Sequence, residues 1–178
     1  MRRPAQRGFT LVELMMVVAI IALLAAFMFT VAARPYDANA QVISEQLAQT
    51  FGFARTRAVS TRKVHRVHLY TSTDGEQIVM VSAAPETGMN YTGTADWGVV
   101  EVKRIPKSAI LWSVTPGAIT TTGESPAEDT NLDYTVTFKP DGSATASTIY
   151  VTDRNGSPRY HRVLVYHATG SSYAREQW

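Results

Sequence analysis

The chain has 178 residues, of which 45% are hydrophobic and 18% charged, and its formal net charge is +2. This length suits one domain with an appended segment, and an aromatic content of 10% supplies a core, which argues against an intrinsically disordered chain. Cysteine is absent, which excludes disulfides, cysteine-based zinc sites and a cysteine nucleophile. Three of the 17 basic residues lie in the first eight positions and the other 14 face 15 acidic residues, so the net charge is a poor argument for nucleic-acid binding.

An apolar run of 20 residues without a charge extends from Leu14 to Ala33. As a helix it would be about 30 Å long, which matches the hydrocarbon thickness of a bilayer. A buried core helix is one alternative, but the run shows no polar face. A secretory signal peptide cut near Ala32 and Ala33 is another. Glu13 argues against both, because a carboxylate at the edge of a membrane span is costly and is usually paired or functional.

The residues before this run read GFTLVE at positions 8–13 and follow a short basic leader. This motif resembles the class III signal sequence of type IV pilins and type II secretion pseudopilins. The resemblance implies that a prepilin peptidase cuts after Gly8 on the cytoplasmic side and methylates the new N-terminus at Phe9. It also implies that Glu13, the fifth residue of the mature chain, meets the terminal amine of an adjacent subunit and sets the register of a filament.

The chemistry of the segment fits this interpretation. The leader carries three arginines that hold it on the cytoplasmic side by the positive-inside rule, namely Arg2, Arg3 and Arg7. Cleavage exposes an α-amino cation, and Glu13 lies one helical turn from Phe9, so the pair can form within one chain or between neighbours. Removing one partner of such a pair in a low dielectric is costly. We therefore predict a leader over residues 1–8 and a transmembrane and assembly helix over 9–34.

An amphipathic periplasmic helix is predicted over residues 35–62. Pro35 removes a backbone donor and should kink the helix or start a new one. Apolar residues recur at spacings of three and four along it: Ile43, Leu47, Phe51, Ala54 and Ala58. This stripe predicts packing on the globular domain, although a separate soluble helix would predict much the same packing. We expect Ser44 among the polar residues that lie mostly elsewhere on the helix.

A β-rich globular domain is predicted over residues 63–178. Short alternating segments indicate seven or eight mainly antiparallel strands, including 64–70, 78–83, 99–105, 110–114, 134–138, 148–152 and 160–167. Residues 85–93 are expected to form a loop, 115–131 a long functional or mobile loop, and 170–178 a partly exposed tail. The expected fold is α+β and pilin-like, with a long N-terminal helix packed on a mainly antiparallel sheet.

Two internal segments resemble the GspH/FimT group of minor pilins and pseudopilins. One is ARTRAV at residues 54–59, near the end of the second helix. The other is the turn FKPDGS at residues 138–143.

Signals for other chemistry are weak. His65 and His68 differ by three on a strand and should face opposite sides, while His161 and His167 would lie roughly 20 Å apart. We predict no metal site and no cofactor. The sequence has no Gly-x-Ser-x-Gly motif and no phosphate loop, so we expect no enzyme.

DNA binding is a separate alternative, because some FimT-like minor pilins bind DNA through a C-terminal Gly-Arg-x-Arg motif during uptake. Here Gly170 is followed by serine and only one arginine, Arg175, comes after it, so the motif is broken. A basic patch with Tyr160 and Tyr173 would consist of Arg154, Arg159, Arg162 and Arg175. A solvated strand face is the favoured explanation of these arginines.

The sequence therefore predicts a minor pilin or pseudopilin, with a DNA-binding FimT-like minor pilin as the alternative. Its expected partners are other pilins or pseudopilins in a filament or tip complex, the prepilin peptidase and the inner-membrane assembly platform. Its expected location is the bacterial inner membrane, crossed once, with the C-terminal domain in the periplasm, and then the pilus or pseudopilus. The signal serves type IV pili and type II secretion alike. A periplasmic domain anchored by an uncut leader, with no filament role, is the remaining alternative.

Overall fold

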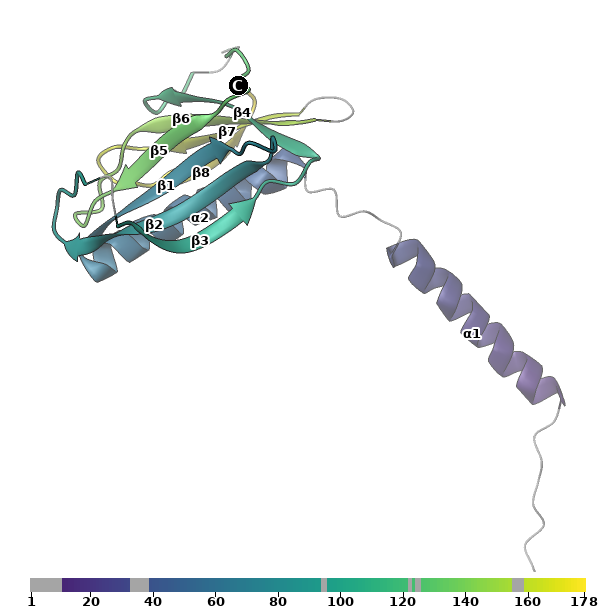
Figure 1. The fold of residues 1–178 in the computed structure, drawn as a ribbon. Coiled ribbons are helices and arrows are strands. Elements are labelled where there is room, and N and C mark those ends of the chain that lie inside the picture. Colours follow the sequence, from purple (N-terminus) through teal and green to yellow (C-terminus); the bar gives the residue numbers. More distant parts are fainter. Residues whose placement is uncertain (1–10, 33–38, 94–95, 122, 124–125, 155–158) are drawn as a thin grey trace, which may run out of the picture. The chain divides into compact units, whose positions relative to one another are not determined.

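The computed structural model describes residues 11–32, 39–93, 96–121, 123, 126–154 and 159–178, with the side chains of the first helix described from 11 to 25. The chain divides into two compact units, Met1–Asp37 and Ala38–Trp178. The first unit contains helix α1 (Leu11–Ala32), and the second contains helix α2 (Ala40–Thr61) and all the described strands (Figure 1).

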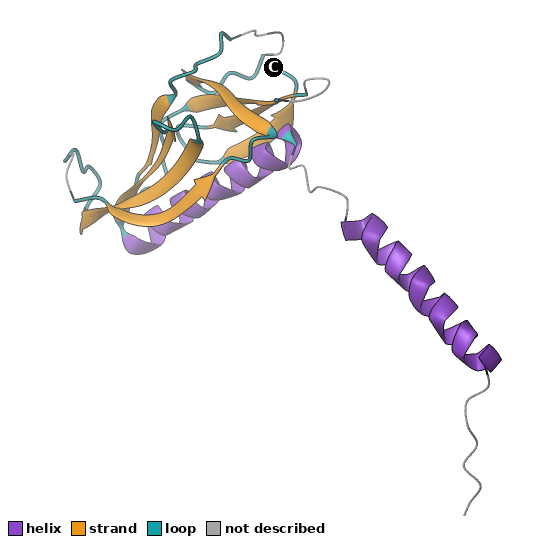
Figure 2. Ribbon diagram, turned by 45° about the vertical axis from the view of Figure 1, so that its right-hand side comes forward, coloured by secondary structure: helices purple, strands orange, loops and turns teal. Residues whose placement is uncertain are grey.

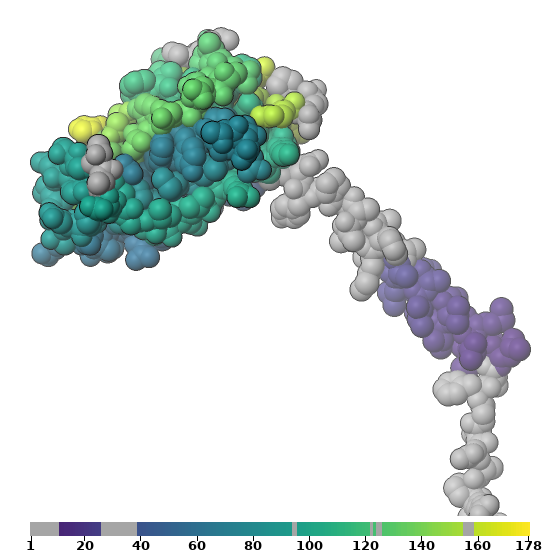
Figure 3. Space-filling model, viewed as in Figure 1, coloured from purple at the N-terminus to yellow at the C-terminus, as the bar shows by residue number. Residues whose placement is uncertain are grey.

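Helix α1 is 22 residues long and consists almost entirely of apolar residues. Its described side chains, drawn in purple in Figure 3, are all exposed, and the large ones range from 49% for Val17 to 76% for Leu11. Among the residues whose side chains are described, no helix is both long enough and apolar enough to cross a membrane.

Helix α2 is capped at its N-terminus by Asn39, whose side-chain oxygen accepts a hydrogen bond from the amide of Val42 at 3.1 Å. The carboxylate of Asp153 accepts a second bond from the amide of Ala40 at 2.6 Å. These two acceptors satisfy amides that the first turn leaves without helical partners. The C-cap residue Arg62 follows the helix in the left-handed conformation, with φ of 54°. Pro35, where we predicted a kink, lies outside the described residues.

The described strands form two four-stranded antiparallel sheets. In spatial order the first sheet contains β3 (Gly98–Arg104), β2 (Gln77–Thr87), β1 (Lys63–Thr71) and β5 (Asp133–Phe138). The second contains β4 (Ala109–Pro116), β6 (Ser147–Asp153), β7 (Tyr160–Val165) and β8 (Ser172–Glu176). Figure 2 shows α2 running along one side of these strands. The architecture is α+β, as the sequence predicts.

The apolar stripe of α2 forms the centre of the core. The predicted residues Ile43, Leu47, Phe51, Ala54 and Ala58 are all at most 3% exposed. Their partners come from both sheets, and Phe51 lies 6.0 Å from Phe138 between ring centroids. The predicted packing of this helix on the globular domain is confirmed. Ser44 is also buried, contrary to the prediction, and its hydroxyl donates to the carbonyl of Gln41 at 2.7 Å.

Three element boundaries differ from the prediction. Strand β2 continues through Pro85 to Thr87, where the sequence predicted a loop. A register shift between Lys63 and His65 lies opposite this stretch, and such an irregularity accommodates a residue that lacks a backbone donor. The tail contains a strand, β8, which pairs with β7 along its length. Strand β7 ends at Val165, so His167 lies in the turn that follows it.

Candidate functional site

The described part of the N-terminal helix is apolar on all sides and has no polar face. Beyond Glu13, every side chain described between residues 11 and 25 is apolar, and all are exposed. A helix that is hydrophobic all round requires a non-aqueous environment or partner helices to cover it. The surface of α1 is therefore the part of this chain that most needs a partner.

Glu13 is the one acidic residue in the first turn of α1. A carboxylate at this end of a helix is favoured by the partial positive charge of the free backbone amides. Gly8 and Phe9, the predicted cleavage and methylation residues, lie outside the described residues. The role predicted for Glu13 remains a prediction.

The two segments that resemble the GspH/FimT group meet in space. Residues 54–59 lie in the last half of α2, and Asp141 and Gly142 form the turn after β5. A side chain at Gly142 would start 3.6 Å from Arg55 Nη2 and 3.7 Å from Val59 Cγ2. The turn is internally held, because Asp141 accepts bonds from the Ser143 hydroxyl and amide, which lower the pKa of that carboxyl. The two segments therefore form one packing contact, between the last half of α2 and the turn after β5.

The histidines are spread over separate environments. Burial lowers the pKa of His65 and of His161. His68 points to the opposite face from His65, as predicted, and its Nε2 lies 2.6 Å from Asp133 Oδ1. His167 Nδ1 lies 2.6 Å from the carbonyl oxygen of Ala144. Within the described ranges, no three histidine, aspartate or glutamate residues cluster closely enough to hold a metal ion.

Arg162 does not belong to a basic surface patch. It is 1% exposed, whereas Arg154, Arg159 and Arg175 are exposed. Its guanidinium donates to the backbone carbonyl oxygens of Thr120, at 3.0 Å, and Thr121. The predicted solvated strand face is therefore wrong at this position. No local pattern could indicate the burial of Arg162, because its acceptors lie about forty residues earlier in the chain.

The long segment between β4 and β5 is held against the second sheet at several points. The amide of Ile119 donates to Thr148 Oγ1, and that hydroxyl donates to the carbonyl of Gly117, each at 2.8 Å. Trp112 Nε1 donates to the carbonyl of Pro126 at 2.8 Å. Together with the Arg162 contacts, these bonds fix the described parts of the segment to β4, β6 and β7.

Comparisons with known proteins agree with this description. Residues 3–29 match the prokaryotic N-terminal methylation motif, and residues 44–170 match the family of type II transport protein GspH. Two solved structures of the minor pseudopilin EpsH from the type 2 secretion system of Vibrio cholerae are similar to this chain. One shares 12% identity over 78% of this chain and 97% of its own, with a TM-score of 0.48. The other shares 13% identity over 78% and 92%, with a TM-score of 0.46. No curated protein matches the sequence.

The methylation motif includes most of the apolar helix α1, and a second helix packed on antiparallel sheets follows it; together they define the class as pilin-like subunits. Because the second match spans more than half of the chain, the protein belongs to the GspH family. It is therefore a structural subunit of the minor pilin or pseudopilin class. Neither these matches nor the described residues favour the DNA-binding alternative.

Proposed function

We propose that the chain is inserted in the inner membrane through residues 9–34, is cleaved after Gly8 and methylated at Phe9, and then joins a type II secretion pseudopilus. Residues 1–8 are the leader, 35–62 the periplasmic helix and 63–178 the periplasmic β-rich domain. The observation that carries the proposal is the methylation motif over residues 3–29, directly ahead of a domain of the GspH family. Partners are other pseudopilins, the peptidase and the assembly platform.

Glu13 is proposed to pair with the methylated terminal amine of an adjacent subunit. Lipid and a bundle of like helices are about equally apolar, so moving α1 between them has little hydrophobic driving force. Specificity must then come from polar groups or from the globular domain. Glu13 is the one acidic side chain of the apolar helix and lies in its first turn, which supports this role.

Intact-mass measurement of the chain produced with a prepilin peptidase tests the cleavage. The expected mass lacks residues 1–8 and includes one added methyl group. Gly8→Arg should leave the leader attached, because a bulky cation blocks close approach of the peptidase. Gly52→Ala is the matched control, since a side chain there meets open space. If the chain still carries residues 1–8 after production with the peptidase, the proposal is overturned and an uncut membrane anchor is favoured.

Co-purification with other pseudopilins tests the assembly role. Glu13→Gln should leave the chain processed and in the membrane fraction but reduce its incorporation into the filament by about tenfold or more, because one partner of a low-dielectric ion pair is removed. Glu45→Gln, an exposed position on α2, is the control that should incorporate normally. Normal incorporation of Glu13→Gln would contradict the charge-register mechanism.

A further inference from the structure

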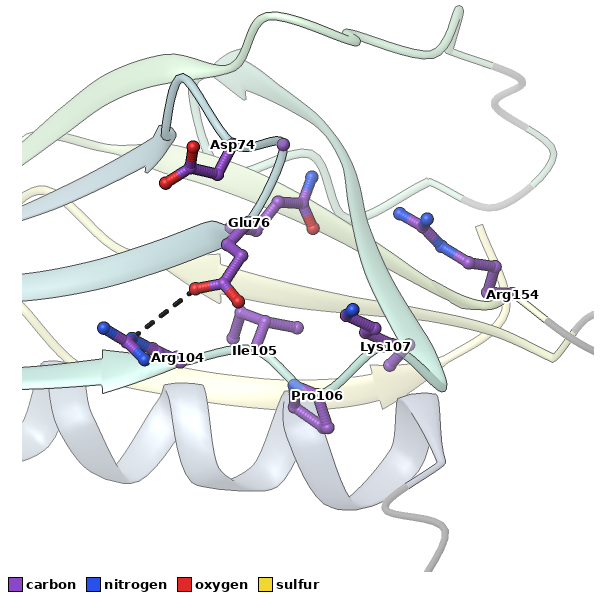
Figure 4. Close-up of a pocket in the computed structure, with 10 residues that line it drawn as sticks. Asp74, Glu76, Arg104, Ile105, Pro106, Lys107 and Arg154 are labelled. Carbon is purple, nitrogen blue, oxygen red and sulfur yellow. Dashed lines mark ion pairs between the residues drawn. The ribbon is translucent and has the colours of Figure 1, made fainter.

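A pocket of about 310 Å³ opens in the globular unit at the end where α2 begins (Figure 4). It is lined by the turn between β1 and β2, the connection between β3 and β4, and Arg154 after β6. The volume lies at the lower end of the range for small-molecule sites, which suits a ligand of a few heavy atoms. Nothing in the GspH match assigns a ligand to this pocket.

The pocket has a fixed frame. Gln77 is buried, and its side-chain amide donates to the carbonyl of Leu111 at 2.8 Å and accepts from the amide of Leu111 at 2.7 Å. The carbonyl of Gln77 accepts from the amide of Ile105 at 2.9 Å, and the amide of Arg154 donates to the carbonyl of Ser108 at 2.8 Å. These bonds hold the three lining segments together, so a ligand would meet a preformed site.

Apart from Arg104, which lies beside Glu76, the charged side chains that line the pocket are separated by sign. Figure 4 shows Asp74 and Glu76 on one side and Lys107 and Arg154 on the other. Glu76 pairs with Arg104 at 3.6 Å. No described carboxylate lies within ion-pair distance of Lys107 or Arg154, and both side chains are exposed. The arrangement fits a zwitterion, with an anionic group beside the two cations and a cationic group beside Asp74.

The same end of the domain is where the chain enters it. Asp153, next to Arg154, accepts a bond from the amide of Ala40 in the first turn of α2. The membrane insertion through residues 9–34 proposed above keeps the globular unit at a membrane, where zwitterionic phospholipid headgroups are abundant ligands. This step rests on the proposed function.

We propose that this pocket binds the phosphoethanolamine headgroup of a membrane phospholipid. Lys107 Nζ and the guanidinium of Arg154 donate to the phosphate oxygens, since charge-assisted bonds of this kind are strong. The lipid ammonium donates to the carboxylate of Asp74. Headgroup binding orients the globular unit on the membrane before assembly and is lost when the subunit leaves the bilayer.

Calorimetric titration of the full chain in a non-ionic detergent with glycerophosphoethanolamine tests the site itself. Binding should weaken about tenfold or more in Lys107→Ala/Arg154→Ala. The control Arg57→Ala/Lys63→Ala removes the same charge near the opposite end of α2 and should bind normally. Asp74→Asn should weaken glycerophosphoethanolamine but not inorganic phosphate. No binding by the parent chain, or equal weakening in both double variants, would overturn the proposal.

A second experiment tests whether the bound headgroup comes from a membrane phospholipid. The full chain is analysed by native mass spectrometry from micelles that contain either phosphatidylethanolamine or phosphatidylcholine with the same acyl chains. Contacts of α1 with acyl chains are common to both lipids, so a difference reports the headgroup. We expect phosphatidylethanolamine to be retained preferentially, and the preference to vanish in Lys107→Ala/Arg154→Ala but not in the control. Equal retention of both lipids would overturn the proposal that the pocket binds the headgroup of a membrane phospholipid. Neither result depends on the leader, whose removal is read separately from the intact mass.

Discussion

Gln77 joins the two sheets, and its replacement by leucine tests how much that junction stabilises the globular unit. Its side chain reaches from the first residue of β2, in one sheet, to the backbone of Leu111 on β4, in the other. Both hydrogen bonds are buried. Leucine has a similar volume, so Gln77→Leu removes the two bonds without opening a large cavity.

The expected loss of stability follows from the two backbone groups of Leu111 that lose their hydrogen-bond partners. Gln77→Leu leaves the amide and the carbonyl of Leu111 buried without these partners, and each such group costs about 1–3 kcal/mol. Burying the additional apolar surface of leucine returns about 1 kcal/mol. The free energy of unfolding should therefore fall by about 1–5 kcal/mol.

Urea unfolding of the full chain in detergent, followed by tryptophan fluorescence, measures this change. The three tryptophans all lie in the globular unit, so the signal reports its unfolding alone. Gln49→Leu, at an exposed position of α2, is the control and should change the unfolding free energy by less than about 0.5 kcal/mol. A change as small as this in Gln77→Leu would show that the bonds to Leu111 contribute little to the junction.

Three other changes should be measurable by the same unfolding assay. Phe51→Ala should lower the free energy of unfolding by about 3–5 kcal/mol, because the ring is fully buried between α2 and the sheets. Gly170→Ala should cost about 1–3 kcal/mol, because its φ is +57° and a side chain would overlap the carbonyl oxygen of Gly142. Burial lowers the pKa of His65 and His161, so their neutral forms stabilise the fold above the ordinary histidine pKa. That contribution is lost as pH falls through the lowered values, and unfolding at pH 5 should need less urea than at pH 7.5. His65→Gln should reduce the difference; an equal difference would contradict the assignment.

The elements that depend on local pattern were predictable from the sequence. The spacing of apolar residues in α2 repeats with the helical period, so Leu47 and Ala58 could be assigned to the core before any partner was known. Alternation and turn residues likewise placed β5 and the pairing of β6 with β7.

The elements that depend on distant partners were not predictable in this way. Strand β8 has no clear alternation, and it exists because its backbone pairs with β7. Arg162 looks like a surface residue until the carbonyls of Thr120 and Thr121 are brought to it. The pocket beside Arg154 is lined by three segments that lie far apart in the sequence, so no single motif could indicate it.

The folding of the globular unit and the proposed assembly role of α1 should be separable. The described residues of the core cluster all lie between Ala40 and Val165, within the globular unit. Glu13→Gln should therefore leave the urea midpoint of tryptophan fluorescence unchanged while impairing incorporation into the filament. A matched shift of the midpoint would show instead that Glu13 acts through the stability of the domain. An unchanged midpoint with lost incorporation would assign the effect to contacts of α1 with neighbouring subunits, because the domain itself would be intact.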